Sequence, residues 1–276
     1  MRKTAAGLAI GMVAAFGVAL PASAISESSA DVFVLHGIPD TPVDVYVDGE
    51  LTLDDFQPGD LAGPLDLPAG DYEVALTATD AADDSSPVLG PVTLSVEANM
   101  SYTAVAHLSE SGEPTVTPFV NDISATAAGE GRLTVRHVAA APAVDILAGG
   151  DAVVSGLANP EEASLDLAAG TVSAAVALEG TTDPVIGPAD VAVDEGVLTI
   201  AYAWGSAEDG NLDLAVQTID GLHSSPDGVP SGSAGYLAER DAQTPLVWML
   251  AGCTIVAAVA VGAAAMARRT AGSERA

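Results

Sequence analysis

The sequence predicts an all-β protein: two tandem antiparallel β-sandwich domains of immunoglobulin-like type, followed by a C-terminal transmembrane helix. Three observations lead to this prediction. One set of short motifs occurs twice in the same order, each copy consists of short alternating segments separated by turn residues, and an uncharged run of 22 residues lies near the C-terminus. Only this last run is long enough to cross a bilayer.

The first 24 residues have the layout of a secretory signal peptide. Arg2 and Lys3 give a positive start, Ala5–Leu20 is apolar, and Ala22–Ala24 has the A-x-A pattern of a cleavage site. The apolar run is shorter than the ~20 residues that a membrane span needs. We therefore expect export and a mature chain that begins at Ile25.

Three motifs of the middle of the chain recur in the same order. They are "HGIPDTPVDVYVDGE" (36–50) with "HVAAAPAVDILAGGD" (137–151), "LDLPAG" (65–70) with "LDLAAG" (165–170), and "PVLGP" (87–91) with "PVIGP" (184–188). One recurrence alone is weak evidence, but collinear recurrence indicates a duplicated unit. We predict one domain at residues 30–122 and a second at residues 131–221.

Within each copy, apolar and polar residues alternate as in a half-buried strand. The clearest case is Val43–Val47, which is followed by Asp48-Gly49, a dipeptide suited to a two-residue hairpin turn. Further strands are expected at 72–78, 92–96, 101–107 and 115–120, and in the second copy at 172–178, 189–193, 197–203 and 212–218. Many short strands without a helical period are typical of an antiparallel sandwich.

The stretches "HGIPDTPVDVYVDG" and "LDLPAGDYEVAL" resemble a bacterial family known only as domain of unknown function 4397. The resemblance extends to both copies, although the second has Ala141, Leu147 and Val172 in place of Asp40, Tyr46 and Tyr72. It implies a secreted or surface-attached β-rich module. It supplies no established activity and no catalytic residues to transfer.

The pairs His36 with Asp44 and His137 with Asp145 combine common metal ligands and acid–base partners. Alternation, however, places each histidine on the inward face at a strand end and turns Asp44 outward, away from His36. A neutral histidine hydrogen-bonded to loop backbone is the structural interpretation, and a metal ligand is the alternative.

Two acidic clusters are candidate calcium sites, although neither has the spacing of an EF-hand loop. The candidates are Asp54 and Asp55, near Asp60, and Asp80, Asp83 and Asp84. A solvated acidic surface is the alternative. No catalytic or cofactor-binding residues are predicted, because the chain has four histidines, no G-x-S-x-G motif, and its single cysteine, Cys253, lies in the predicted span. We therefore expect no enzyme activity.

The chain is strongly acidic, with a net charge of -30 at pH 7. Its 38 acidic residues all lie between positions 25 and 245 except Glu274, and only Arg132, Arg136 and Arg240 oppose them there. Such a surface repels phosphate, which excludes nucleic acid as a natural partner. Cations, basic proteins or high external salt are better matches.

The outward residues of the opening strand differ between the copies. Phe33 and Leu35 in the first correspond to Thr134 and Arg136 in the second. An apolar outer face needs a cover. The candidates are a segment of the same domain, the second domain, or another protein.

Residues 222–245 are rich in Ser, Gly, Pro and Asp and are predicted to form a stalk. Residues 246–267 form the predicted transmembrane helix, and residues 268–276 the tail. Three arginines follow the span, so the positive-inside rule puts the tail in the cytoplasm. No sortase-type L-P-x-T-G motif precedes the span, so we expect a protein that stays in the membrane.

These features predict a non-enzymatic module of the bacterial cell surface, single-pass with an extracellular ectodomain, that binds or spaces something in the envelope. A wall polymer, another surface protein or a cation is the expected partner. A salt-adapted structural spacer without a ligand is the alternative, and a hydrolase with an unrecognised site is the third hypothesis.

Overall fold

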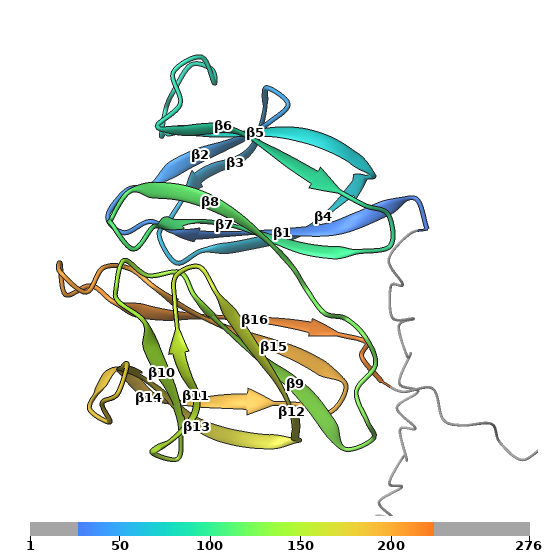
Figure 1. Cartoon of the computed structure of the whole chain (residues 1–276). Helices are drawn as coiled ribbons and strands as arrows, with labels where there is room; N and C mark the ends of the chain where they lie inside the picture. Colours follow the sequence, from blue (N-terminus) through green and yellow to red (C-terminus); the bar gives the residue numbers. More distant parts are fainter. Residues whose placement is uncertain (1–26, 224–276) are drawn as a thin grey trace, which may run out of the picture. The chain divides into compact units, whose positions relative to one another are not determined.

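The computed structural model describes residues 27–223, which all lie within one compact unit. Their regular structure is sixteen β-strands in four sheets of four strands each (Figure 1). The all-β prediction is therefore confirmed, with a sandwich-like arrangement. Within residues 27–223 no helix is suited to crossing a membrane. The predicted signal peptide, transmembrane helix and tail, and nearly all of the stalk, lie outside the described residues.

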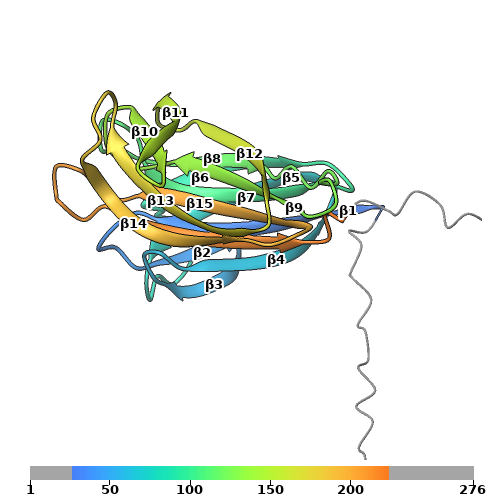
Figure 2. The ribbon, with the colours of Figure 1, turned by 90° about the horizontal axis from the view of Figure 1, so that it is seen from below.

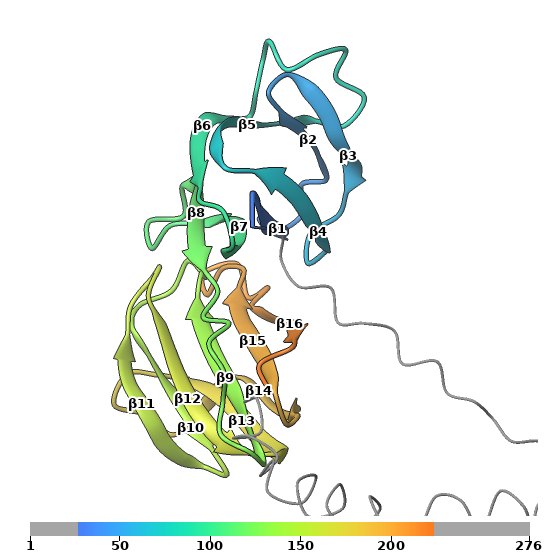
Figure 3. The ribbon, with the colours of Figure 1, turned by 90° about the vertical axis from the view of Figure 1, so that its right-hand side faces the viewer.

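The first eight strands form two sheets. Their bounds are β1 Ser29–Gly37, β2 Val43–Val47, β3 Glu50–Phe56, β4 Leu61–Pro68, β5 Gly70–Ala78, β6 Leu89–Val96, β7 Ser101–Leu108 and β8 Pro114–Val120. The strand order is β4-β1-β7-β8 in one sheet and β3-β2-β5-β6 in the other. Figure 3 shows these two sheets as separate layers. We call this part the first repeat.

The last eight strands form the second repeat. Their bounds are β9 Glu130–His137, β10 Val144–Ala148, β11 Asp151–Leu157, β12 Glu162–Ala168, β13 Gly170–Leu178, β14 Pro184–Val193, β15 Val197–Trp204 and β16 Asp213–Asp220. The orders β12-β9-β15-β16 and β11-β10-β13-β14 are those of the first repeat with every strand number raised by eight. Figure 2 shows the strands of both repeats from below. The duplicated motifs thus occur in two units of the same topology.

Two pairings depart from the predicted antiparallel arrangement. Strand β1 runs parallel to β7, and β9 runs parallel to β15. Each of these pairs joins the first strand of a repeat to its seventh, with strands of the other sheet between them in the sequence. Apolar alternation is the same in parallel and antiparallel strands, so the sequence pattern carried no information on this direction.

Four strands were missed by the sequence prediction, namely β3, β4, β11 and β12. They are edge strands, and most of their residues are exposed or half-buried on both faces. Their apolar alternation is correspondingly weak, and Gly and Asp within them look like turn signals. The motif "LDLPAG", for example, supplies the end of β4 as well as the turn into β5.

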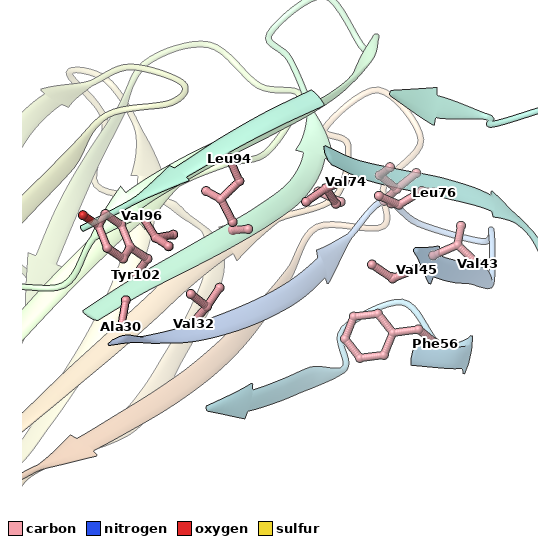
Figure 4. Close-up of a cluster of buried hydrophobic side chains, with 13 residues drawn as sticks. Ala30, Val32, Val43, Val45, Phe56, Val74, Leu76, Leu94, Val96 and Tyr102 are labelled. Atoms are coloured by element: carbon pink, nitrogen blue, oxygen red, sulfur yellow. The ribbon is translucent and has the colours of Figure 1, made fainter. Parts of the chain in front are cut away.

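Each repeat has its own core between its two sheets. In the first repeat Val32 and Tyr102 from one sheet face Val45, Leu76 and other residues of the opposite sheet (Figure 4). The second repeat has the matching cluster around Val135, Ile146 and Val176. Burying a side chain of this kind contributes ~1.5–3 kcal/mol relative to leaving it exposed. With no cysteine among residues 27–223, these cores stabilise the fold without disulfides.

A third apolar cluster combines residues of both repeats. Leu35, Val105 and Phe119 of the first repeat belong to it, and so do Leu198, Ile200, Tyr202 and further residues of the second. Leu35 is 0% exposed. Of the covers considered for the outer face of the opening strand, the second repeat is the one that buries Leu35. Phe33 is half-buried instead.

The folded part includes residues that the sequence assigned to the stalk. Leu222 is 1% exposed and belongs to the third cluster, and its carbonyl accepts the N–H of Thr126 at 2.8 Å. Thr126 lies in the connection between the repeats and is itself buried. The end of the second repeat and the connection are therefore packed together.

Candidate functional site

His36 and His137 occupy corresponding strand ends and have the same environment. Both are almost fully buried, and the Nε2 atoms lie 2.6 Å from the Thr41 carbonyl and 3.1 Å from the Pro142 carbonyl. A carbonyl only accepts, so Nε2 carries the proton in each ring. The Nδ1 atoms are buried without a hydrogen-bond partner. This agrees with the predicted neutral histidine bonded to loop backbone.

A third histidine, His107 at the end of β7, is also buried. Its Nδ1 lies 2.8 Å from the Leu108 carbonyl and its Nε2 lies 2.8 Å from the hydroxyl of Thr117. Burial lowers the pKa of His36, His107 and His137 below the ordinary value, because a charged imidazolium is poorly solvated there. All three rings are thus held neutral and committed to structural hydrogen bonds.

Asp44 and Asp145 are buried, 2% and 6% exposed, although alternation predicted an outward Asp44. Asp145 accepts the N–H groups of Gly156 and Gly180, both at 2.9 Å. Asp44 accepts the N–H of Asp55 at 2.9 Å. The carboxylate therefore satisfies backbone donors where the paired strands bulge, which explains how a charged group is tolerated at this position. It does not pair with the histidine of its repeat.

The calcium candidates Asp54 and Asp55 lie beside the buried Asp44. Ligand oxygens of these three residues lie within 4.8 Å of one another. Desolvation, and then the negative charges of Asp44 and Asp55, raise the pKa of Asp54. The sequence analysis did not include Asp44 in this cluster. The signal was the two-residue turn at Asp48-Gly49, which brings β3 back alongside β2.

The second predicted cluster, on the loop between β5 and β6, approaches the first. Asp80 acts electrostatically on Asp54, and Asp83 and Asp84 act on Tyr46 of β2. Asp60, in contrast, closes a turn, because its carboxylate accepts the N–H of Gln57 at 3.1 Å. Three converging carboxylates are ligands that a hard cation such as Ca²⁺ prefers, though Ca²⁺ takes about six to eight oxygens.

The junction between the repeats contains a buried polar network around Arg136. This side chain is 1% exposed and donates to Glu162 at 2.7 Å and to the Tyr202 hydroxyl at 2.8 Å. Its guanidinium lies 4.4 Å from the ring centre of Phe119 in the first repeat. The Tyr202 hydroxyl donates to Gln217 at 2.6 Å. Arg136 thus connects the two repeats through charge, hydrogen bonds and a cation–π contact.

Gln217 extends this network into the first repeat. Its Oε1 lies 3.1 Å from the hydroxyl of Thr103, which in turn lies 3.2 Å from Asn121. All three side chains are buried. Sequence analysis noted the change from Leu35 to Arg136 but did not predict that Arg136 is the main polar contact of the junction. The available signal was the scarcity of arginine in this acidic segment, because a rare cationic side chain among many carboxylates readily forms ion pairs.

Two open grooves are lined by residues of both repeats. One, of about 620 Å³, lies between the β7–β8 hairpin, with Ser109 and Glu110, and Asn159 of the second repeat. The other, of about 600 Å³, lies between the β1–β2 loop, with Asp40, and Trp204 and Asp213 of the second repeat. The junction therefore forms surfaces that neither repeat has alone.

Fold and junction together define the class, an all-β protein of two joined repeats of the same topology. Residues 30–147 match the family model of DUF4397, a domain of unknown function. The resemblance to this family that the motifs predicted is thus confirmed over this stretch. The match covers the first repeat and ends in β10.

No curated protein matches this chain. Among solved structures, the Bacillus anthracis TIE protein is similar at 14% sequence identity, over 71% of this chain and 32% of that one, with a TM-score of 0.18. The chain spans about a third of that protein's length, and the TM-score is too low to indicate a shared fold.

Proposed function

We propose that this chain is a non-enzymatic binding or spacer module of the bacterial cell surface. In this proposal the second repeat is a second copy of the family's domain, both repeats are immunoglobulin-like sandwiches, and residues 246–267 anchor them outside the membrane. The observation that carries the proposal is the junction. The two sandwiches share a buried apolar cluster and a buried arginine. They are therefore presented together as one packed unit, and not as two independent domains on a linker.

The state of the histidines supports a non-enzymatic role. General acid–base catalysis needs a group that is within reach of a substrate and titrates near the working pH. His36, His107 and His137 are buried, and burial lowers the pKa of each. Nε2 of His36 and of His137 faces a backbone carbonyl, and the two ring nitrogens of His107 face a backbone carbonyl and the Thr117 hydroxyl. This arrangement stabilises strand ends and favours binding over hydrolysis.

Anchoring is tested by fractionating cells that produce the full chain and a variant without residues 246–267. We expect the full chain in the membrane fraction, with a mature N-terminus at Ile25, and the deletion variant in the medium. Full-length protein in the medium would contradict the anchor. An uncleaved N-terminus would contradict the signal peptide.

Binding and spacing are separated by chemical crosslinking on intact cells, followed by capture of the full chain. A binding module predicts one recurrent crosslinked partner at physiological salt, lost when an excess of the purified protein competes. A spacer without a ligand predicts no such partner. If purified protein instead hydrolyses wall material, the non-enzymatic proposal is wrong.

A further inference from the structure

The groove of about 600 Å³ at the junction combines loops of the first repeat with the β15–β16 connection of the second. Its first wall contains Pro39, Asp40 and Pro58, and its second wall contains Trp204 and Asp213. The walls are bridged where the Asn211 side chain amide lies 3.5 Å from the Asp40 carboxylate. Any ligand in this groove would touch both repeats at once.

Trp204 gives the groove an aromatic wall. A Cβ on Gly59 would lie 3.1 Å from the indole ring, so the absence of a side chain there lets the backbone approach the ring closely. On the other side of this contact a second hollow, of about 330 Å³, also has Trp204 and Asp213 in its lining, together with Asp60. The indole N–H is buried without a hydrogen-bond acceptor. The two hollows thus share one tryptophan and one carboxylate.

The charge around these hollows has one sign. Asp40, Asp60 and Asp213 are exposed, and the lining of the two hollows contains no lysine or arginine. Among residues 27–223 the only cationic side chains of that kind are Arg132 and Arg136, and both are buried in ion pairs elsewhere. Within the described part of the chain, no cation is free to neutralise the groove.

We propose that this groove binds arginine or lysine side chains of a partner protein. The proposal rests on the binding form of the proposed function and names its partner class, a basic polypeptide segment. The long stem of such a side chain packs on proline, leucine and tryptophan walls, while its charged head reaches a carboxylate. The Trp204 ring adds a cation–π attraction for the same head group.

The other junction groove provides a natural comparison. It has a similar volume, about 620 Å³, but its lining contains one carboxylate, Glu110, and no tryptophan. The remaining residues of that lining are mainly hydroxyl-bearing, such as Ser109 and Thr115. Removing two negative charges from this side, with Glu110→Gln and Glu113→Gln, changes the net charge as much as removing two from the tryptophan groove.

The test is a titration of the full chain in detergent with a blocked tri-arginine peptide at 0.15 M NaCl. Tryptophan fluorescence reports on the groove once Trp248→Phe leaves Trp204 as the only tryptophan. We expect a saturable change, and none with a tri-citrulline peptide, which has the same shape without the charge. The double variant Asp40→Asn and Asp213→Asn should weaken binding about tenfold or more, because it removes the carboxylates that the charged head group reaches.

The double variant Glu110→Gln and Glu113→Gln should leave the affinity within about twofold. If the two double variants weaken peptide binding equally, the peptide is attracted only by the net negative charge of the protein, and the proposal is overturned. Saturable binding without a Trp204 signal, or no saturable binding, would also overturn it. Asparagine tolerates the left-handed backbone of residue 40, φ 54°, so the groove variant is expected to fold.

Crosslinking on cells separates this inference from the proposed function. If the wild-type chain and the groove variant capture the same partner equally, the groove inference fails and the binding function stands. If the wild-type chain captures no partner while the groove still binds tri-arginine specifically, the binding function fails and the groove's chemistry stands.

Discussion

The hairpins that follow the first strand of each repeat have the same backbone but different charge. In the second repeat, the N–H groups that Asp145 accepts come from Gly156 and Gly180, with φ of 70° and 74°. In the first repeat the corresponding positions are Asp55 and Asp80, with φ of 51° and 62°. The bulge therefore needs a residue that tolerates positive φ, and aspartate meets this need as well as glycine does.

That choice changes the surroundings of the buried carboxylate. In the second repeat Asp145 accepts from two glycines, and Ser155 takes the sequence position of Asp54. In the first repeat Asp54 and Asp55 lie beside Asp44, and Asp80 acts electrostatically on Asp54. Asp145 serves only as a hydrogen-bond acceptor that stabilises the fold, whereas Asp44, at the corresponding position, is also the buried member of an acidic cluster. Functional differences between duplicated domains can thus arise at turn positions without any change of topology.

Separating the repeats should have the largest effect. Residues 131–223 alone are expected to fold cooperatively as a β-rich unit, but Leu198, Ile200 and Tyr202 lose their cover from the first repeat. At ~1.5–3 kcal/mol for each such side chain, the free energy of unfolding should fall by about 5 kcal/mol. Urea unfolding of this fragment and of residues 27–223 gives the comparison. Equal stabilities would show that the junction contributes nothing, and an unfolded fragment would show that the repeats are not independent.

Arg136→Ala should be the most damaging single change at the junction. It leaves Glu162 and the Tyr202 hydroxyl without their cationic partner and opens a space beside Phe119. Removing one member of a buried ion pair costs ~3–5 kcal/mol. Arg136→Leu is the matched control, because Leu35 occupies this position in the first repeat, and it should cost less. If Arg136→Leu lowers the free energy of urea unfolding as much as Arg136→Ala does, packing of the leucine side chain does not compensate for the lost charge.

The sequence predicted much of the fold because each repeat shows clear apolar alternation within its strands and turn residues between them. Strands with a well-buried apolar face, such as β2 and β5, were found for this reason, whereas the mostly exposed edge strands β3 and β11 were not. The burial of Asp44 was missed because alternation distinguishes the two faces of a strand but does not reveal what covers the second face. Only the tertiary structure brings Asp54 and Asp55 beside the carboxylate of Asp44.

The junction was the least predictable feature. The change from Leu35 to Arg136 indicated that the two outer faces differ, but nothing in the pattern paired Arg136 with Phe119, which lies in β8. Long-range contacts of this kind depend on how two sheets stack. The calcium candidates show the same limit, since the loop clusters were found separately and their convergence on Tyr46 was not.

The buried aspartates allow the two repeats to be compared by one substitution. Asp145→Ala leaves the N–H groups of Gly156 and Gly180 without their acceptor, and a hydrogen bond to a charged group contributes ~1.5–3 kcal/mol. We expect a loss of about 3 kcal/mol in unfolding free energy. Asp44→Ala should cost less, because it frees one N–H and also removes repulsion from Asp54. If urea unfolding shows a larger loss of unfolding free energy for Asp44→Ala than for Asp145→Ala, Asp44 is the more important of the two for stability and this prediction is wrong.

Acid should destabilise both repeats through their buried histidines. Burial lowers the pKa of His36, His107 and His137, so the native state binds fewer protons than the unfolded state below the ordinary pKa of ~6.5. Their contribution to stability is complete above pH ~6.5 and is lost as the pH falls below it.

Removing one of these rings should make that pH dependence shallower. His137→Gln keeps a donor for the Pro142 carbonyl and removes one titrating group, so the slope of unfolding free energy between pH 6.5 and 5 should fall by up to ~1.4 kcal/mol per pH unit. His36→Gln, at the corresponding position, should do the same. An unchanged slope in both variants would mean that these rings titrate normally in the folded protein.

The smallest expected effect concerns the acidic cluster that distinguishes the first repeat. Repulsion among Asp44, Asp54 and Asp55 should fall as the Debye length shrinks from ~30 Å at 0.01 M salt to ~3 Å at 1 M, so the melting temperature should rise with sodium chloride. Asp54→Asn should raise it at low salt and weaken this dependence, whereas Asp190→Asn, an exposed change in the second repeat, should do less.

Calcium at matched ionic strength then separates screening from coordination. Screening alone gives equal gains for the two salts, whereas a cation held by Asp44, Asp54 and Asp55 adds a stabilisation that grows with the logarithm of its free concentration and disappears in Asp54→Asn. We expect a modest additional gain from calcium, because three carboxylates supply only part of a calcium shell. A steep rise at micromolar calcium would mean that the loop carrying Asp80 completes the shell. A melting temperature independent of both salts would show that repulsion among these carboxylates does not destabilise the first repeat measurably.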